Sequence, residues 1–127
     1  MKHRISFLVG LFALLTGLAS AETITSAEAA RRVAEGTAVL IDVREPREWR
    51  DGVAEPALLL SLSDLRGERT QWTSALKAHA GKQLILYCRS GNRSGIAAAI
   101  LEKEGFVAPN AGSFKDWVAA ELPTRKP

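Results

Sequence analysis

Four short apolar runs along the chain predict the strands of a buried sheet. Each has the length of a strand rather than of a helix, and β-branched side chains occur within the longer ones. The runs cover residues 38–43, 57–62, 83–87 and 106–109.

Segments with helical composition separate these runs. The first opens with a capping box, in which Thr25 is the N-cap and Glu28 follows three residues later, and Gly36 ends it. The last has Ser113 as its N-cap, and we expect Trp117 and Val118 to face inward. The predicted helical segments are 25–35, 46–50, 71–80, 94–104 and 113–121.

The alternation of strands and helices predicts a small α/β fold, with a central, mostly parallel sheet and helices on both faces. The chain has 127 residues, 46% of them hydrophobic, which fits one packed domain and leaves no room for two. Its single cysteine excludes an intramolecular disulfide framework and a cysteine-rich metal site.

Residues 1–21 have the pattern of a secretory signal peptide: a basic start, an apolar stretch at 5–18 and small residues before the cleavage point. An uncleaved membrane anchor is the alternative, but the apolar stretch is shorter than the roughly 20 residues that cross a bilayer. We therefore expect cleavage after Ala21, a domain at 22–127, and a periplasmic protein with no stable insertion in the membrane. Secretion from the cell is the alternative destination.

Cleavage would also remove Lys2 and Arg4, and with them most of the net charge of +3. The basic balance of the whole chain therefore gives no reason to expect a nucleic-acid partner.

Cys88 directly follows the predicted strand 83–87, at the edge where ligands bind in parallel sheets. A thiol above the first turn of a helix, with arginines close by, has a lowered pKa and is a nucleophile as its thiolate. Gly91 lets the backbone N–H groups of the loop converge on one point and cradle an anion. The candidate site residues after Cys88 are Arg89, Ser90, Gly91, Asn92, Arg93 and Ser94.

Each of these residues also has a simpler interpretation. Cys88 could be a small buried hydrophobic residue, although a core cysteine does not need such a polar loop after it. We expect Arg93 to hold an anionic substrate beside the sulfur and Arg89 to attract anions at the mouth. The alternative for both arginines is a solvated surface charge.

Three segments together resemble single-domain rhodaneses, over roughly residues 26–122. The first is the strand with Asp42 and Arg44 in an Asp-x-Arg motif, the second is the loop from Cys88 to Ser94, and the third is the closing segment that ends in Trp117. The loop is the most specific of the three.

The resemblance implies a sulfurtransferase without a cofactor or a metal. Cys88 would take a sulfur atom from thiosulfate or a similar small anionic donor and pass it, as a persulfide, to a thiophilic acceptor such as cyanide or a thiol. The resemblance also implies that Asp42 and Arg44 support the loop structurally, with Glu48 extending their ion pair. A thiolate needs no general base, so we expect no catalytic role for His79 and expect its side chain at the surface. We also expect the protein to be a monomer.

Two segments depart from the family pattern. Residues 52–57 lack the usual His and have a displaced Pro, and residues 110–113 keep one Gly where the family has a cluster. We expect these departures to alter loop geometry and a pocket wall, and not the cysteine chemistry.

Two other functions remain open. A rhodanese-like phosphatase or arsenate reductase would use the same cysteine, but tyrosine phosphatases place five residues between Cys and Arg, whereas four separate Cys88 from Arg93. A non-catalytic module that binds sulfur or senses it is the second alternative.

Overall fold

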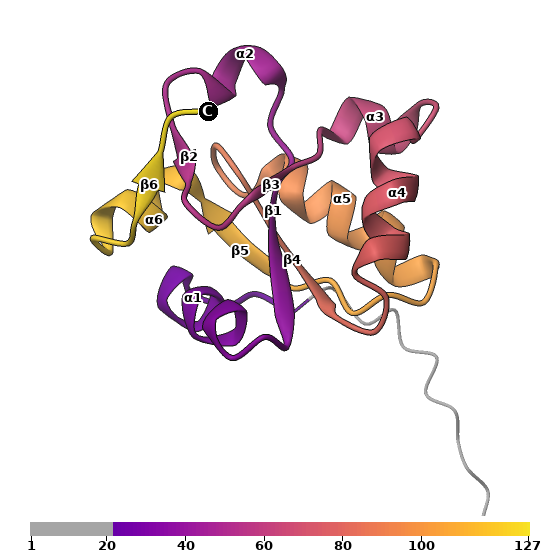
Figure 1. Cartoon of the computed structure of the whole chain (residues 1–127), viewed down its shortest axis with the longest axis horizontal. Coiled ribbons are helices and arrows are strands. Elements are labelled where there is room, and N and C mark those ends of the chain that lie inside the picture. Colours follow the sequence, from indigo (N-terminus) through magenta and orange to yellow (C-terminus); the bar gives the residue numbers. More distant parts are fainter. Residues whose placement is uncertain (1–21) are drawn as a thin grey trace, which may run out of the picture.

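The computed structural model describes residues 22–127, so the predicted signal peptide lies outside the described residues. Helices and strands alternate along this part of the chain except in its middle, where two strands and then two helices follow one another (Figure 1). The helices are α1 (Ser26–Ala34), α2 (Pro46–Trp49), α3 (Leu62–Arg66), α4 (Thr70–Ala78), α5 (Asn92–Lys103) and α6 (Phe114–Ala119). The strands are β1 (Ala38–Asp42), β2 (Val53–Ala54), β3 (Leu58–Leu59), β4 (Gln83–Cys88), β5 (Asn110–Ser113) and β6 (Thr124–Arg125).

Four strands form a parallel sheet in the order β3-β1-β4-β5. β1 and β4 lie at its centre and pair over five positions, from Ala38 opposite Gln83 to Asp42 opposite Tyr87. Their carboxyl ends therefore reach the same edge, which places Asp42 and Cys88 close to one another. A second, two-stranded antiparallel sheet joins β2 to β6.

Alternate side chains of β4 enter two separate cores, because successive residues of a strand point to opposite faces. Leu84, Leu86 and Cys88 pack on one face with residues of α3, α4 and α5. Ile85 and Tyr87 pack on the other face with residues of α1 and α6. Helices thus cover both faces of the sheet, which confirms the predicted fold class.

Capping residues set the helix boundaries largely as the sequence predicts. The Thr25 hydroxyl accepts a hydrogen bond from the backbone N–H of Glu28 at the start of α1, and the Ser113 hydroxyl accepts one from Asp116 at the start of α6. Helix α5 begins at Asn92, two residues earlier than predicted, because Gly91 already turns the chain with φ +93°.

Two predicted strands are wrong in extent. Only residues 58–59 of the run 57–62 form a strand, since the chain then turns into α3 at Leu62. The run 106–109 lies along β4, and Leu86 donates to the Pro109 carbonyl, but Pro109 has no N–H with which to continue the ladder. Strand β5 therefore begins only at Asn110.

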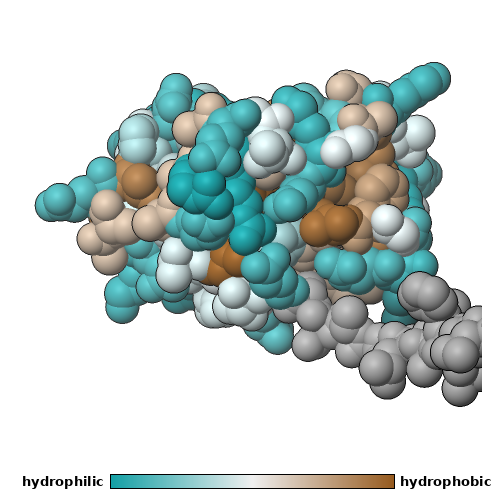
Figure 2. Space-filling view, turned by 90° about the horizontal axis from the view of Figure 1, so that it is seen from below, coloured by the Kyte–Doolittle hydropathy of each residue, from teal (hydrophilic) through white to brown (hydrophobic). Residues whose placement is uncertain are grey.

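Of the residues expected to face inward on the last helix, Trp117 is buried and Val118 is 49% exposed. Neighbouring residues of a helix lie about 100° apart, so a short helix buries only one of them. Trp72, at 0% exposure, fills the core under α4. Seen from below, the surface is mainly hydrophilic, with hydrophobic residues in small separate areas (Figure 2).

Candidate active site

The site is built where β4 ends and α5 begins. Cys88 is the last residue of β4, and the loop after it turns at Gly91 into the 12-residue helix α5. The free N–H groups at the start of this helix therefore point toward the sulfur, as predicted from the order of strand, loop and helix. Cys88 is fully buried, and Arg89, Ser90 and Asn92 are exposed on the loop around it.

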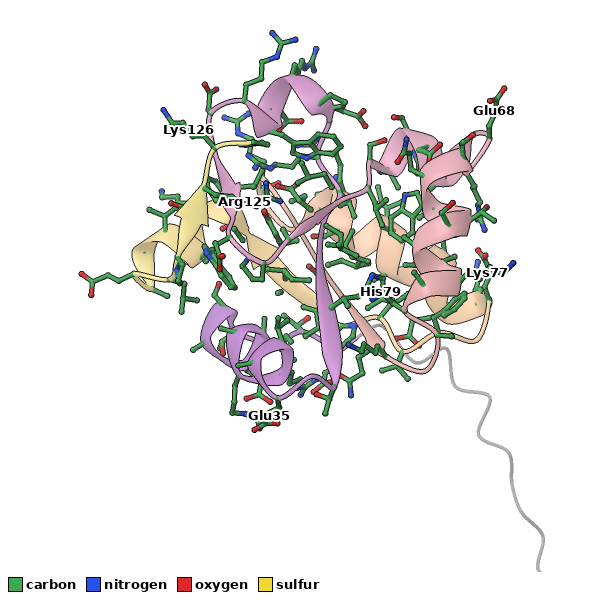
Figure 3. The ribbon with its side chains drawn as sticks, viewed as in Figure 1. Glu35, Glu68, Lys77, His79, Arg125 and Lys126 are labelled. Carbon is green, nitrogen blue, oxygen red and sulfur yellow. The ribbon has the colours of Figure 1, made fainter. Side chains whose placement is uncertain are left out.

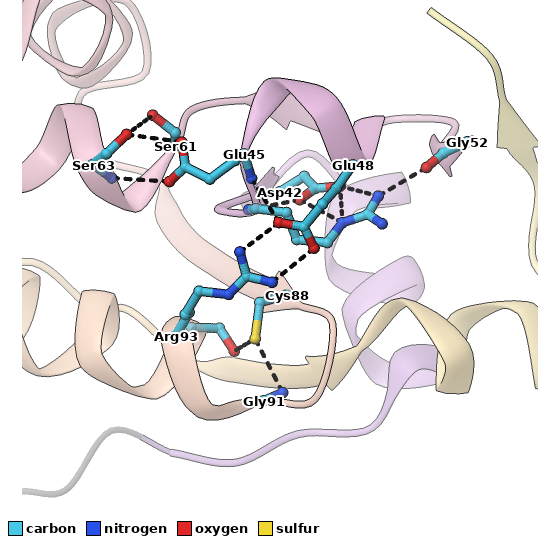
Figure 4. A network of polar contacts seen from close by, with 11 residues as sticks. Asp42, Glu45, Glu48, Gly52, Ser61, Ser63, Cys88, Gly91 and Arg93 are labelled. Carbon is cyan, nitrogen blue, oxygen red and sulfur yellow. Dashed lines mark hydrogen bonds and ion pairs between the residues drawn. The ribbon is translucent and has the colours of Figure 1, made fainter. Parts of the chain in front are cut away.

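The Cys88 sulfur accepts two hydrogen bonds. The backbone N–H of Gly91 lies 3.0 Å from Sγ, and the Ser94 hydroxyl lies 3.3 Å from it (Figure 4). Burial raises the pKa of Cys88, but the hydrogen bonds from Ser94 and from the backbone N–H groups of the loop outweigh it and leave the pKa below its ordinary value. The predicted direction is confirmed, with hydrogen bonds rather than the arginines as its main cause.

Arg93 does not project freely into the site. Its guanidinium makes two hydrogen bonds to the Glu48 carboxylate of α2, at 2.6 and 2.8 Å (Figure 4). Arg93 holds the pKa of Glu48 down at about 2, and Glu48 in turn raises that of Arg93. Glu48 therefore pairs with the loop rather than extending the pair of Asp42 and Arg44, and a direct role of Arg93 in binding the donor stays a prediction.

Asp42 and Arg44 form the buried pair that the motif predicts. The Arg44 guanidinium donates to both carboxylate oxygens of Asp42 at 2.8 to 3.1 Å and also donates to the Gly52 carbonyl at 2.8 Å. The same guanidinium lies over the ring of Phe114, 4.6 Å from its centroid. The pair thus ties the end of β1 to Gly52, just before β2, and to Phe114 of α6.

The segment that departs from the family pattern is held by this same framework. Gly52 accepts from Arg44, and β2 pairs with β6 near the end of the chain. The Ala54 N–H donates to the Tyr87 hydroxyl at 3.0 Å. Residues 52–57 are therefore tied to the framework that supports the Cys88 loop, although they lack the expected His.

Asn110 is a site residue that the sequence analysis missed. Its side chain lies under the loop and bonds to Ser94, to the Gly91 carbonyl and to the backbone N–H of Gly112. The sequence indicates only a changed pocket wall at 110–113, because it is the pairing of β5 with β4 that brings the Asn110 amide beside Ser94.

His79 lies away from the Cys88 loop. It follows α4 near the start of β4 (Figure 3). Cys88 lies at the other end of that strand, about 15–20 Å away. In residues 22–127 no cluster of His, Cys, Asp and Glu is arranged to hold a metal ion. No helix in that range is long and apolar enough to cross a membrane.

The rhodanese-like domain model matches residues 25–120 of the chain. The chain therefore belongs to the rhodanese-like domain family. It is 35% identical, over 98 residues, to a putative mitochondrial thiosulfate sulfurtransferase of Schizosaccharomyces pombe, and the match covers 68% of each protein. Its matches to the next curated relatives span 47% and 60% of their lengths.

Solved structures of the family share this fold. A human single-domain sulfurtransferase is 28% identical, with a TM-score of 0.63 and coverage of 78% of this chain and 96% of the other. A Rhodopseudomonas palustris protein named a possible tyrosine phosphatase is 29% identical, with a TM-score of 0.69 and coverage of 84% and 86%. The chain thus has sulfurtransferase-related homologues, and the family also includes proteins assigned to other chemistry.

Proposed function

We propose that the protein is a thiosulfate sulfurtransferase that carries sulfur as a persulfide on Cys88. The observation that supports this best is the convergence of the Gly91 N–H and the Ser94 hydroxyl on the Cys88 sulfur. These donors stabilise a thiolate, which is the form that attacks a sulfur atom.

In the first step the Cys88 thiolate attacks the outer sulfur of thiosulfate. A bond forms between the two sulfur atoms, the sulfur–sulfur bond of thiosulfate breaks, and sulfite leaves with its electron pair. Cys88 is then a persulfide whose single negative charge lies on the outer sulfur. No proton is transferred, so the step needs no general base, in agreement with the distant position of His79.

In the second step an acceptor such as cyanide or a thiolate attacks the outer sulfur of the persulfide. The sulfur–sulfur bond breaks, the electron pair returns to Cys88 as a thiolate, and with cyanide the product is thiocyanate. The loop N–H groups that stabilise the thiolate also lie where they can stabilise the anionic persulfide.

The direct test is the mass of the intact protein before and after incubation with thiosulfate. We expect a gain of one sulfur atom that cyanide removes, and turnover of thiosulfate with cyanide. Cys88→Ser should abolish both the gain and the turnover. A Cys88→Ser protein that still transfers sulfur from thiosulfate to cyanide would disprove the proposal.

A phosphatase or arsenate reductase is tested on the same preparation with an aryl phosphate and with arsenate. The loop is one residue shorter than that of tyrosine phosphatases, because four residues separate Cys88 from Arg93. The Arg93 guanidinium is also paired with Glu48, whereas a phosphatase needs this arginine to bind the phosphate. Hydrolysis of the aryl phosphate without sulfur loading would favour the phosphatase, and neither activity would favour a non-catalytic module.

We also propose that the protein is exported to the periplasm, cleaved after Ala21 and monomeric. The proposal of export rests on the pattern of residues 1–21. The mass of protein purified from the periplasm tests the cleavage site. The described part of the chain exposes only Val107 and Val118 among its large hydrophobic residues, which supports a monomer, and size-exclusion chromatography with light scattering tests it.

A further inference from the structure

The Ser94 hydroxyl faces two acceptors. It lies 3.3 Å from the Cys88 sulfur and 2.8 Å from Oδ1 of Asn110, and both distances are within hydrogen-bonding range for their atom types. A hydroxyl has one hydrogen to donate. Ser94 can therefore donate a full hydrogen bond to Cys88 or to Asn110, but not to both at once.

Two backbone groups fix the orientation of the Asn110 amide. The Gly112 N–H, 3.0 Å away, requires an acceptor and identifies the atom that faces it as Oδ1. The Gly91 carbonyl, also 3.0 Å away, requires a donor and identifies the other atom as Nδ2. Oδ1 therefore faces Ser94, so the hydroxyl must donate in this contact, since an amide oxygen has no hydrogen of its own.

The two protonation states of Cys88 place the Ser94 hydrogen differently. When Cys88 is a thiol, its S–H can donate to Ser94 while Ser94 donates to Asn110, and every polar group is satisfied. When Cys88 is a thiolate, the charged sulfur attracts the Ser94 hydrogen, and Oδ1 of Asn110 keeps only the Gly112 N–H. Ionisation therefore requires the hydroxyl to leave Asn110.

We propose that Asn110 is a positioning residue that competes with Cys88 for the hydrogen of Ser94. It holds the hydroxyl away from the sulfur while the sulfur is neutral and releases it when the sulfur becomes charged. A persulfide carries its charge on the outer sulfur, so Ser94 can then return to Asn110. The sulfur thus receives its strongest side-chain donor only in the state that performs the attack.

The charged groups near Cys88 do not distinguish these states. Arg93 of α5 is paired with Glu48 of α2, and Arg89 is exposed on the loop. The buried pair of Asp42 and Arg44 lies at the neighbouring strand end. The Asn110 side chain bonds to none of these groups, so its replacement leaves their charges unchanged. A change in the ionisation of Cys88 would therefore report on the Ser94 hydrogen bond.

The test is a pH titration of the Cys88 thiolate by its ultraviolet absorbance, in the protein without bound sulfur. The chain has one cysteine and one tyrosine, and burial raises the pKa of Tyr87 far enough to keep tyrosinate out of the titration. Asn110→Leu replaces the amide by an apolar group of the same branched shape. It should lower the pKa of Cys88, because Ser94 then donates to the sulfur alone.

Ser94→Ala provides the control for an effect through the loop. It should raise the pKa of Cys88, and adding Asn110→Leu to it should cause no further shift, because the shared hydrogen is gone. Equal shifts in the two backgrounds would mean that Asn110 acts only by holding Gly91, and would overturn the proposal. An unchanged or raised pKa in Asn110→Leu alone would also overturn it.

Asn110→Asp provides a second variant should the leucine variant not fold. Its carboxylate keeps an acceptor for Ser94 and Gly112 and binds the hydroxyl more strongly. It should raise the pKa of Cys88, and by more when Ser94 is present than in Ser94→Ala. An equal rise in both backgrounds would contradict the proposal.

The inference deepens the proposed function, because the hydrogen of Ser94 matters to sulfur transfer only if Cys88 is the sulfur carrier. The titration needs no thiosulfate, so it can fail while sulfur loading succeeds. Loading can likewise fail while the titration behaves as expected.

Discussion

Arg93 and Glu48, 45 residues apart in the chain, form a two-bond ion pair beside the Cys88 loop. The pair joins α2, which follows the Asp-x-Arg motif, to the first turn of α5. It neutralises the arginine that the loop sequence presents as an anion ligand. Cys88 itself is fully buried beneath the loop.

Glu48→Gln should make the site more attractive to thiosulfate. Loss of the carboxylate charge releases Arg93 to interact with a dianion, and we expect the KM for thiosulfate to fall about two- to tenfold, which corresponds to about 0.4–1.4 kcal/mol. The measurement is steady-state transfer to cyanide at low salt, where charge interactions are least screened. Arg93→Gln is the matched variant and should raise the KM. A raised KM in both would show that the pair only maintains the loop.

The same pair should stabilise the fold in a pH-dependent way. Arg93 lowers the pKa of Glu48 from 4.5 to about 2. The stabilisation is therefore complete above the unfolded value and is lost as the pH falls from about 4.5 to about 2. Urea unfolding at neutral and at acid pH measures this effect. On acidification the free energy of unfolding should fall by about 1–2 kcal/mol less in Glu48→Gln than in the unaltered protein, a range that allows for solvent screening. Equal losses in the two proteins would contradict a stabilising pair.

Gly91→Ala should impair the loop and the fold together. Gly91 has φ +93°, and an added Cβ would meet only ordinary contacts, 3.5 Å from Gly112, so the cost is backbone strain of about 1–2 kcal/mol. The loop relieves that strain by moving the N–H of residue 91 away from the Cys88 sulfur. Transfer of sulfur from thiosulfate to Cys88 should therefore slow. Gly81→Ala is the matched control, with φ +84° and open space around it. It should cost similar stability and leave loading unchanged, and slowed loading there would indicate a general effect of stability.

Arg44→Leu should be strongly destabilising. Asp42 is fully buried and Arg44 nearly so, and removing one partner leaves an unpaired buried charge at a cost of about 3–5 kcal/mol. Arg47→Leu makes the same substitution at an exposed arginine and should change the free energy of unfolding by about 0.5 kcal/mol or less. Urea denaturation of both variants measures the difference. Similar stabilities would show that Asp42 becomes protonated or hydrated at little cost.

Much of this site is built from residues that lie close to one another along the chain. The order of apolar runs and capping residues predicts a parallel sheet covered on two faces, and the position of Cys88 after a strand and before a helix predicts a nucleophile at its carboxyl edge. The buried pair of Asp42 and Arg44 was also predicted from the sequence, because a buried carboxylate needs a partner and Arg44 lies two residues away.

Only the tertiary structure decided which groups complete the site. The pairing of Arg93 with Glu48 and the contact of Ser94 with Asn110 join segments that are 45 and 16 residues apart. Residue patterns report periodicity and local turns, whereas these partners are brought together by the order of strands in the sheet. The sequence alone thus predicted a nucleophile at Cys88 and the loop that surrounds it, and the packing of α2 and β5 against that loop decided the partners of Arg93 and Ser94.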